Sequence, residues 1–140
     1  VNILPLKEKI PSRKERWFYY FIVTADDGKY LGRERKDKDI WKNLYEFVLW
    51  ETGKLMPQQQ IRESGFVQEN FGKTGFQILH ISDEMQQTLT HQTIHGCFVH
   101  IRLKKPGKRL KSYLPVPADQ LDQYPFPGLI SNYLKSGIIT

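Results

Sequence analysis

The chain has 140 residues, of which 39% are hydrophobic and 13% aromatic, enough apolar material for one globular domain with its own core. This composition excludes a disordered chain, and no apolar run approaches the roughly 18 residues that a membrane span needs. Cys97 is the only cysteine, which excludes an intrachain disulfide and a four-cysteine iron–sulfur cluster within these residues. We therefore expect a reducing compartment.

The net charge of +6 is unevenly distributed. Residues 39–100 hold four Lys and Arg against seven Asp and Glu, whereas residues 101–117 hold six basic side chains and no acid. These six are Arg102, Lys104, Lys105, Lys108, Arg109 and Lys111. Such a segment attracts a phosphate backbone, but it is equally typical of a solvated hairpin, and charge alone leaves both interpretations open.

The chain is expected to begin with a linker. Pro5 and Pro11 interrupt residues 1–16, which are rich in bases, so we expect the domain itself to occupy residues 17–140. The first residue is Val1 rather than Met, and we expect the chain to be a segment of a longer protein. Residues 17–24 are apolar or aromatic on both alternating faces, which predicts an interior strand.

The following residues predict a mixed sheet with few helices. A turn at residues 26–29 leads into a strand over residues 30–35, and another strand is expected over residues 45–50. Pro57 is typical of a helix start, here over residues 57–63. The rest of the chain predicts strands over 77–81 and 94–103, a turn at 104–108, a strand over 110–115 that pairs back on 94–103, and helices over 117–121 and 129–135. This order indicates an α+β fold in one domain.

Two blocks of sequence carry the most specific signal. The first contains Arg33-x-Arg35, Asp39-Ile40-Trp41 and Leu44-Tyr45-Glu46-Phe47, and the second is Leu89-Thr90-His91-Gln92. In this order and at this separation they resemble the C-terminal domain of the adenine-specific mismatch DNA glycosylases, the MutY family. The resemblance covers nearly the whole chain, and it implies a Nudix-like fold, a mixed β-sheet with a few flanking helices. Asp39 and Asn43 stand where many relatives have glycine, and Leu89 stands where many have phenylalanine.

The resemblance implies a DNA-repair role with named contacts. Thr90 takes the place of the hydroxyl residue that reads 8-oxoguanine opposite adenine, and Leu89 and His91 support it. A hydroxyl can accept from the N7 proton of the damaged base, while a backbone N–H donates to its C8 oxygen. The other expected DNA contacts are Arg33, Arg35, Trp41, Lys104, Lys105 and Lys108.

The same resemblance places the chemistry outside this chain. Adenine excision in that family needs a helical N-terminal domain with a catalytic acid pair and an iron–sulfur cluster, so we expect no catalytic residue, metal or cofactor here. The implied partners are double-stranded DNA that contains 8-oxoguanine opposite adenine, the N-terminal catalytic domain of the same protein, and a further repair protein. No membrane partner is expected. The implied location is the bacterial cytoplasm, at the nucleoid.

Two alternatives remain open. A divergent Nudix hydrolase of damaged nucleotides needs a glutamate-rich helix that holds magnesium, but residues 53–63 offer one glutamate and three glutamines, which predicts no hydrolysis. A zinc site at His91 and His95 is not a further alternative, because the two side chains would lie about 13 Å apart on a strand, too far to share one ion. A protein-interaction module that binds a repair partner through exposed aromatics such as Trp50 is the second alternative.

Overall fold

One long apolar stretch forms β1 (Lys14–Thr24), the strand around which the fold is built. The computed structural model describes residues 13–136. The other strands are β2 (Lys29–Glu34), β3 (Tyr45–Glu46), β4 (Val48–Thr52), β5 (Phe76–Ile81), β6 (Met85–Thr88), β7 (Gln92–Leu103) and β8 (Leu114–Pro117). The α-helices are α2 (Gln58–Arg62), α3 (Gly65–Phe71) and α4 (Gly128–Lys135), and short 3-10 turns are η1 (Gly72–Thr74), η2 (Lys108–Leu110) and η3 (Ala118–Gln123).

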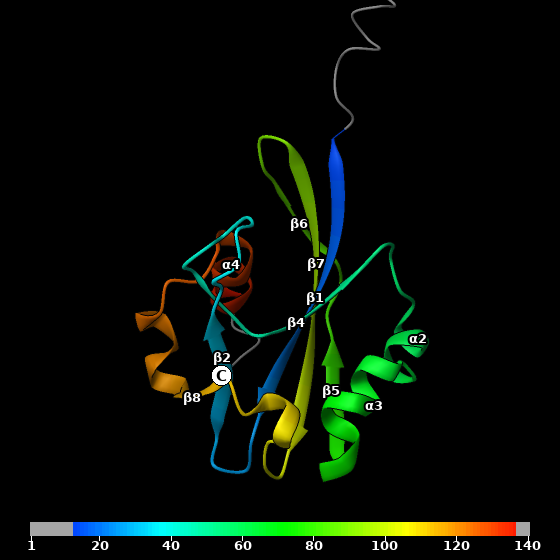
Figure 1. Cartoon of the computed structure of the whole chain (residues 1–140), viewed down its shortest axis with the longest axis vertical. Coiled ribbons are helices and arrows are strands. Elements are labelled where there is room, and N and C mark those ends of the chain that lie inside the picture. The colour runs from blue at the N-terminus through cyan, green and yellow to red at the C-terminus, as the bar shows by residue number, and fades with distance from the viewer. Residues whose placement is uncertain (1–12, 137–140) are drawn as a thin grey trace, which may run out of the picture.

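The strands form a mixed sheet with β1 at its centre. Its order is β3-β2-β1-β7-β5, and β4, β6 and β8 pair with β1, β7 and β2 respectively. β1 and β7 run parallel in one unbroken register, from Lys14 opposite Gln92 to Thr24 opposite Arg102. All the other pairs are antiparallel. The parallel pair places the start of β1 beside the start of β7, at one end of the molecule (Figure 1).

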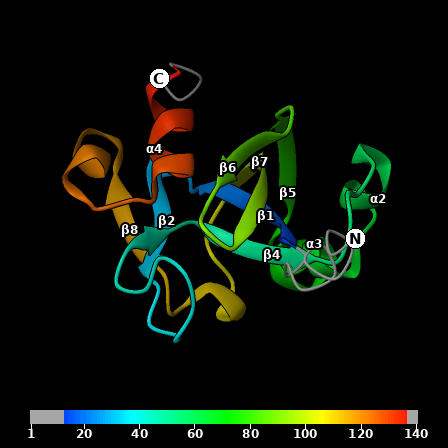
Figure 2. The same ribbon diagram turned by 90° about the horizontal axis from the view of Figure 1, so that it is seen from above.

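Both faces of the sheet are covered. Tyr19 and Phe21 point into a core shared with α2 and α3, whereas Phe18 and Tyr20 point into a second core shared with α4. Figures 1 and 2 show α4 on one side of the sheet and α2 with α3 on the other. A central strand covered in this way must be apolar on both faces, as the sequence of β1 predicts. The expected α+β fold in one domain is confirmed.

The structure changes some of the expected boundaries. β1 begins at Lys14, three residues before the expected domain start, and residues 1–12 of the expected linker lie outside the described residues. The expected strand over residues 45–50 is divided at the buried Phe47, because β3 pairs with β2 while β4 pairs with β1. α3 and β6 were not predicted.

The prediction that residues 110–115 pair back on residues 94–103 is wrong. β8 pairs with β2 instead. The reason is that both edges of β7 are already occupied, one by β1 and the other by β5 and β6. Leu110 in η2 is buried in the core on the α3 side and directs the chain toward β2. No helix within residues 13–136 is long and apolar enough to span a membrane.

Candidate functional site

The sequence Leu89-Thr90-His91-Gln92 forms the tight turn between β6 and β7. The strands pair up to Thr88 opposite Thr93, and the Leu89 N–H donates to the Gln92 carbonyl at 2.8 Å. Thr90 and His91 are therefore the two central residues of the turn, and both are exposed. Leu89 is half-buried against the core on the α4 side, so it anchors the turn rather than projecting as a free wedge.

The N-terminal end of β1 supports this turn from the side. The Arg13 guanidinium donates to the carbonyls of Leu89 and Gln92, and the Lys14 N–H donates to the His91 carbonyl at 3.2 Å. These bonds are made to the backbone of the turn, so they fix its path while the Thr90 hydroxyl and the His91 imidazole stay exposed.

The first block folds into an irregular loop over residues 35–44. The Arg35 N–H donates to the Leu44 carbonyl at 2.8 Å, and the Asn43 N–H donates back to the Arg35 carbonyl at 2.7 Å. Trp41 and Asn43 have φ of 60° and 72°, in the left-handed region that favours glycine. Such a backbone costs a bulky residue about 1–2 kcal/mol. At Trp41 the indole offsets this by packing edge-on against Phe18, with ring centroids 5.7 Å apart.

Arg16 lies between the loop and the turn. Its guanidinium donates to both carboxylate oxygens of Asp39, at 2.8 and 2.9 Å, and to the Gln92 side-chain oxygen at 3.2 Å. It also donates twice to Glu51, at 2.8 Å each. Hydrogen bonding to Arg16 lowers the pKa of Asp39 to about 2, so this carboxylate stays ionised. Its negative charge is balanced by the guanidinium at the edge of the site. The two blocks that the sequence singled out are therefore connected in space.

The two arginines of the first block lie in different environments. Arg35 has a side chain only 8% exposed, held by Glu46 at 2.8 Å and Asp39 at 3.0 Å. Its guanidinium holds the loop in place through these two carboxylates, and its role as a phosphate contact stays a prediction. Arg33 is 42% exposed, bonds Glu46 at 3.3 Å and lies over the ring of Tyr113. It retains a guanidinium that an incoming phosphate can reach.

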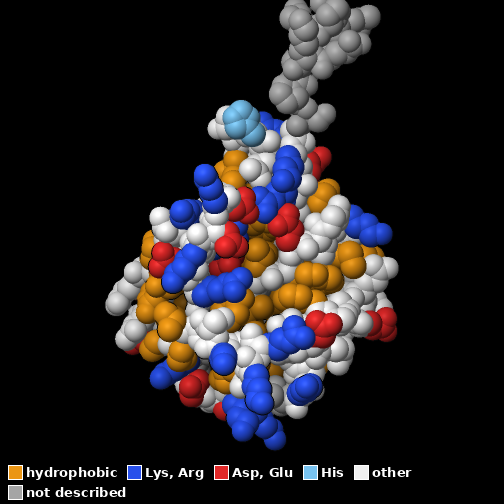
Figure 3. Space-filling view, in the orientation of Figure 1, with side chains coloured by type: hydrophobic (Ala, Val, Ile, Leu, Met, Phe, Trp, Pro, Cys, Tyr) orange, Lys and Arg blue, Asp and Glu red, His pale blue; other side chains and the backbone are white. Residues whose placement is uncertain are grey.

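The basic segment lies at the opposite end of the sheet. Lys104 directly follows the last residue of β7, whereas the Thr90-His91 turn precedes its first. Twelve residues of strand separate the two ends by roughly 36 Å. Figure 3 shows basic side chains gathered at the lower end of the molecule, where β7 ends in Figure 1. Lys104, Lys105 and Lys108 are therefore not brought to the turn, and their role as DNA contacts stays a prediction.

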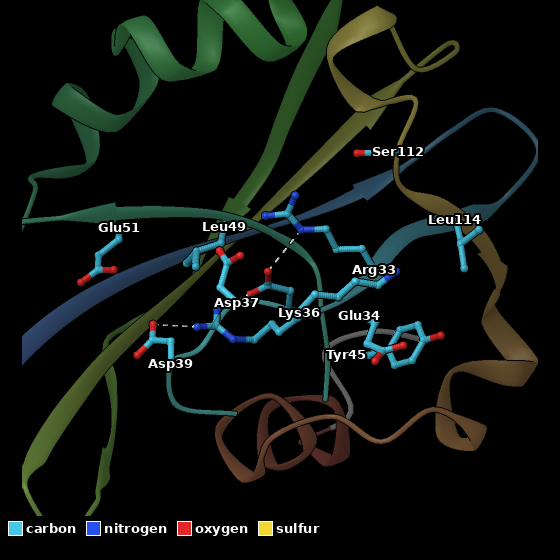
Figure 4. Close-up of a pocket in the computed structure, with 12 residues that line it drawn as sticks. Arg33, Glu34, Lys36, Asp37, Asp39, Tyr45, Leu49, Glu51, Ser112 and Leu114 are labelled. Atoms are coloured by element: carbon cyan, nitrogen blue, oxygen red, sulfur yellow. Dashed lines mark hydrogen bonds and ion pairs between the residues drawn. The ribbon is translucent and has the colours of Figure 1, made fainter. Parts of the chain in front are cut away.

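A pocket of about 570 Å³ lies beside the loop. Asp39 and Glu51 lie at one end and Leu114 at the other (Figure 4), with Arg33 and Lys36 among the remaining lining residues. Side chains of both charges line it, and Glu46 is its most buried carboxylate.

The residues present do not fit a catalytic metal of the hydrolase kind. Glu63 accepts from Gln59 at 2.6 Å, and Glu69 pairs with Arg109 at 3.7 Å. Within residues 13–136 no three His, Cys, Asp or Glu side chains are arranged to hold a metal ion. No step of hydrolysis can be derived through such an ion from these donors.

Sequence reasoning missed the importance of Arg16. A signal was present, because Arg16 alternates with Phe18 and Tyr20 and so had to face the core on the α4 side. A buried guanidinium requires carboxylate partners, but the sequence does not say which ones.

Trp50 also lies elsewhere than expected. It is half-buried and stacks on Phe66, with ring centroids 5.4 Å apart, and is not an exposed aromatic.

Comparison with known proteins identifies the family. A family model described as a NUDIX domain matches residues 19–136. The chain belongs to the NUDIX domain family. No curated protein matches the sequence. The solved structures that this NUDIX domain resembles share its fold at low sequence identity.

Three of these structures show the range of the resemblance. The C-terminal domain of mouse MUTYH, solved in complex with human PCNA, has a TM-score of 0.66 at 13% identity, over 87% of this chain and 86% of that one. MutT protein from Methanosarcina mazei has a TM-score of 0.60 at 13% identity, over 90% and 94%. A NUDIX hydrolase from Nitrosomonas europaea has a TM-score of 0.59 at 13% identity, over 89% and 88%. The fold is thus shared by hydrolases and by a domain of MUTYH.

Proposed function

We propose that this NUDIX domain reads 8-oxoguanine opposite adenine in duplex DNA, as the lesion-recognition domain of an adenine DNA glycosylase. The observation that carries the proposal is the Thr90-His91 turn, which exposes both residues at the tip of an anchored hairpin. The sequence resemblance to the MutY family and the structural likeness to the mouse MUTYH domain support it.

The chemistry of the damaged base matches these groups. 8-Oxoguanine differs from guanine in carrying a proton on N7 and an oxygen on C8. A threonine hydroxyl can accept from the first, and a backbone N–H can donate to the second, so one residue can test both changes. His91 can donate to a neighbouring phosphate, and the half-exposed guanidinium of Arg33 can contact another.

Lesion recognition and adenine excision then belong to two different domains. This domain supplies selectivity for the lesion and part of the DNA affinity. Adenine excision belongs to an N-terminal catalytic domain with its own iron–sulfur cluster, which would be the principal protein partner.

The test is equilibrium binding of the domain to two duplexes that differ only in 8-oxoguanine or guanine opposite adenine. Thr90→Ala is expected to reduce the ratio of the two affinities by a factor corresponding to about 1–3 kcal/mol, the usual value of a good base-edge contact. Thr90→Ser keeps the hydroxyl and should preserve the ratio. Thr88→Ala is the matched control, because Thr88 is also exposed but lies on β6 outside the turn. Equal ratios for wild type and Thr90→Ala would refute the proposal.

Nucleotide hydrolysis is the second candidate, favoured by family membership and by the pocket of about 570 Å³ beside Arg33. It predicts that the isolated domain, with magnesium, hydrolyses 8-oxo-dGTP to the monophosphate and pyrophosphate. The donor set predicts no release above the blank. Magnesium-dependent turnover above the blank would establish the hydrolase and displace the lesion-reading proposal.

A further inference from the structure

Arg16 links two parts of the chain that the proposed function needs to act together. The loop over residues 35–44 and the Thr90-His91 turn are separated by more than forty residues in the sequence. In the fold, Arg16 bonds Asp39 of the loop and Gln92 at the base of the turn. The bridge therefore runs Asp39–Arg16–Gln92.

The guanidinium of Arg16 is saturated by these contacts. A guanidinium has five N–H groups. Arg16 makes two bonds to Asp39, two to Glu51 and one to Gln92, which accounts for all five. One face of the group lies over the Phe18 ring, 4.8 Å from its centroid, and the residue is only 8% exposed. Arg16 has no donor left for a phosphate, so it acts through the residues that it holds.

This geometry requires an arginine. A planar fork can hold two carboxylates and an amide in fixed directions, whereas a lysine ammonium is a single point with three donors. The charges also balance, because Asp39 and Glu51 offset Arg16, and Asp39 is shared with Arg35. The Asp39 charge, at a position where many members of the resembled family have glycine, is thus compensated within the protein rather than directed at DNA.

We propose that Arg16 is a positioning residue that fixes the loop over residues 35–44 relative to the Thr90-His91 turn, and so sets how selectively the domain reads oxidised guanine. This inference rests on the proposed function. Hydrogen bonds to a base edge weaken steeply outside a narrow range of distance and angle. A turn that shifts relative to the loop should therefore lose selectivity before it loses overall affinity, which comes mainly from phosphates.

The experiment compares Asp39→Asn with Glu51→Gln. Each removes one carboxylate charge from Arg16, but Asp39 belongs to the bridge, whereas Glu51 lies on β4 and outside it. Two properties are measured for wild type, both variants and Arg16→Lys. One is the amide chemical shift of Thr90 and His91 in the free protein, and the other is the affinity ratio for the 8-oxoguanine and guanine duplexes. Urea unfolding measures the stability of each variant.

We expect Asp39→Asn and Arg16→Lys to move the Thr90 and His91 amide shifts and to lower the affinity ratio about tenfold, within the range for residues coupled in one network. Glu51→Gln should leave both unchanged at a similar loss of stability. If Asp39→Asn and Glu51→Gln alter shifts and ratio alike, or neither alters them, Arg16 only stabilises the fold and the inference is overturned. A wild-type domain that binds both duplexes equally overturns the proposed function instead, and the amide shifts of the free protein still decide whether Arg16 couples the loop to the turn.

Discussion

Removal of the Glu46 carboxylate is expected to be one of the most destabilising single changes in this domain. Glu46 has a side chain only 3% exposed, and it accepts from Arg35 at 2.8 Å and from Arg33 at 3.3 Å. It also accepts from the Tyr20 hydroxyl at 3.1 Å. Burial, reinforced by the charge of Glu46, holds the pKa of Tyr20 well above its ordinary value, so the hydroxyl remains a donor.

The magnitude follows from what Glu46→Ala leaves behind. Arg35, at 8% exposure, keeps Asp39 as its one carboxylate partner among residues 13–136, and Tyr20 loses its acceptor. Removing one member of a buried ion pair costs about 3–5 kcal/mol, because the remaining charge stays buried. Glu46→Gln keeps an acceptor of the same shape, so its cost should be about 1–3 kcal/mol, the range for an impaired buried hydrogen bond.

Urea unfolding followed by tryptophan fluorescence measures both losses. Glu69→Ala is the matched control, since Glu69 and Arg109 form a pair at 3.7 Å with both side chains more than 60% exposed. This control should change the unfolding free energy by less than about 0.5 kcal/mol. If Glu46→Ala is no more destabilising than Glu69→Ala, the buried network does not hold the loop over residues 35–44 in the way described.

Two further predictions concern the hairpin and the packing of α4. Burial opposes protonation of His95, but hydrogen bonds to Glu84 and Glu15, at 2.8 and 2.7 Å, outweigh it and raise its pKa above the ordinary 6.5. The pKa of Glu84 is lowered from 4.5 in spite of burial, so the contribution of this trio should be greatest between about pH 4.5 and 6.5 and should decline as His95 deprotonates at higher pH. Urea unfolding from pH 5 to 8 should show this decline in wild type and not in His95→Gln, and identical slopes would contradict it. Gly96→Ala would place a methyl group 2.5 Å from a Leu129 methyl. This overpacking should lower the free energy of unfolding by about 1–3 kcal/mol, which thermal unfolding measures. An unchanged melting temperature would show that α4 shifts freely to accommodate it.

Much of this fold could be predicted from local sequence pattern. Residues 17–24 and 94–103 are largely apolar and predict β1 and β7, because a strand that is covered on both faces carries apolar side chains on both. The Thr90-His91 turn was singled out by the resemblance to the MutY family and not by local pattern, because β6, the strand before it, was not predicted.

Tertiary structure alone decided how these parts meet. The parallel pairing of β1 with β7 brings Arg16 beside Gln92, and no local pattern specifies a pairing between strands so far apart in the sequence. The same pairing places Lys104 at the far end of the sheet from the turn, which the charge of the segment does not indicate. Arg33 and Arg35 look equivalent in the sequence, yet one is half-exposed and the other is buried, because side-chain exposure depends on what the whole fold packs against each residue.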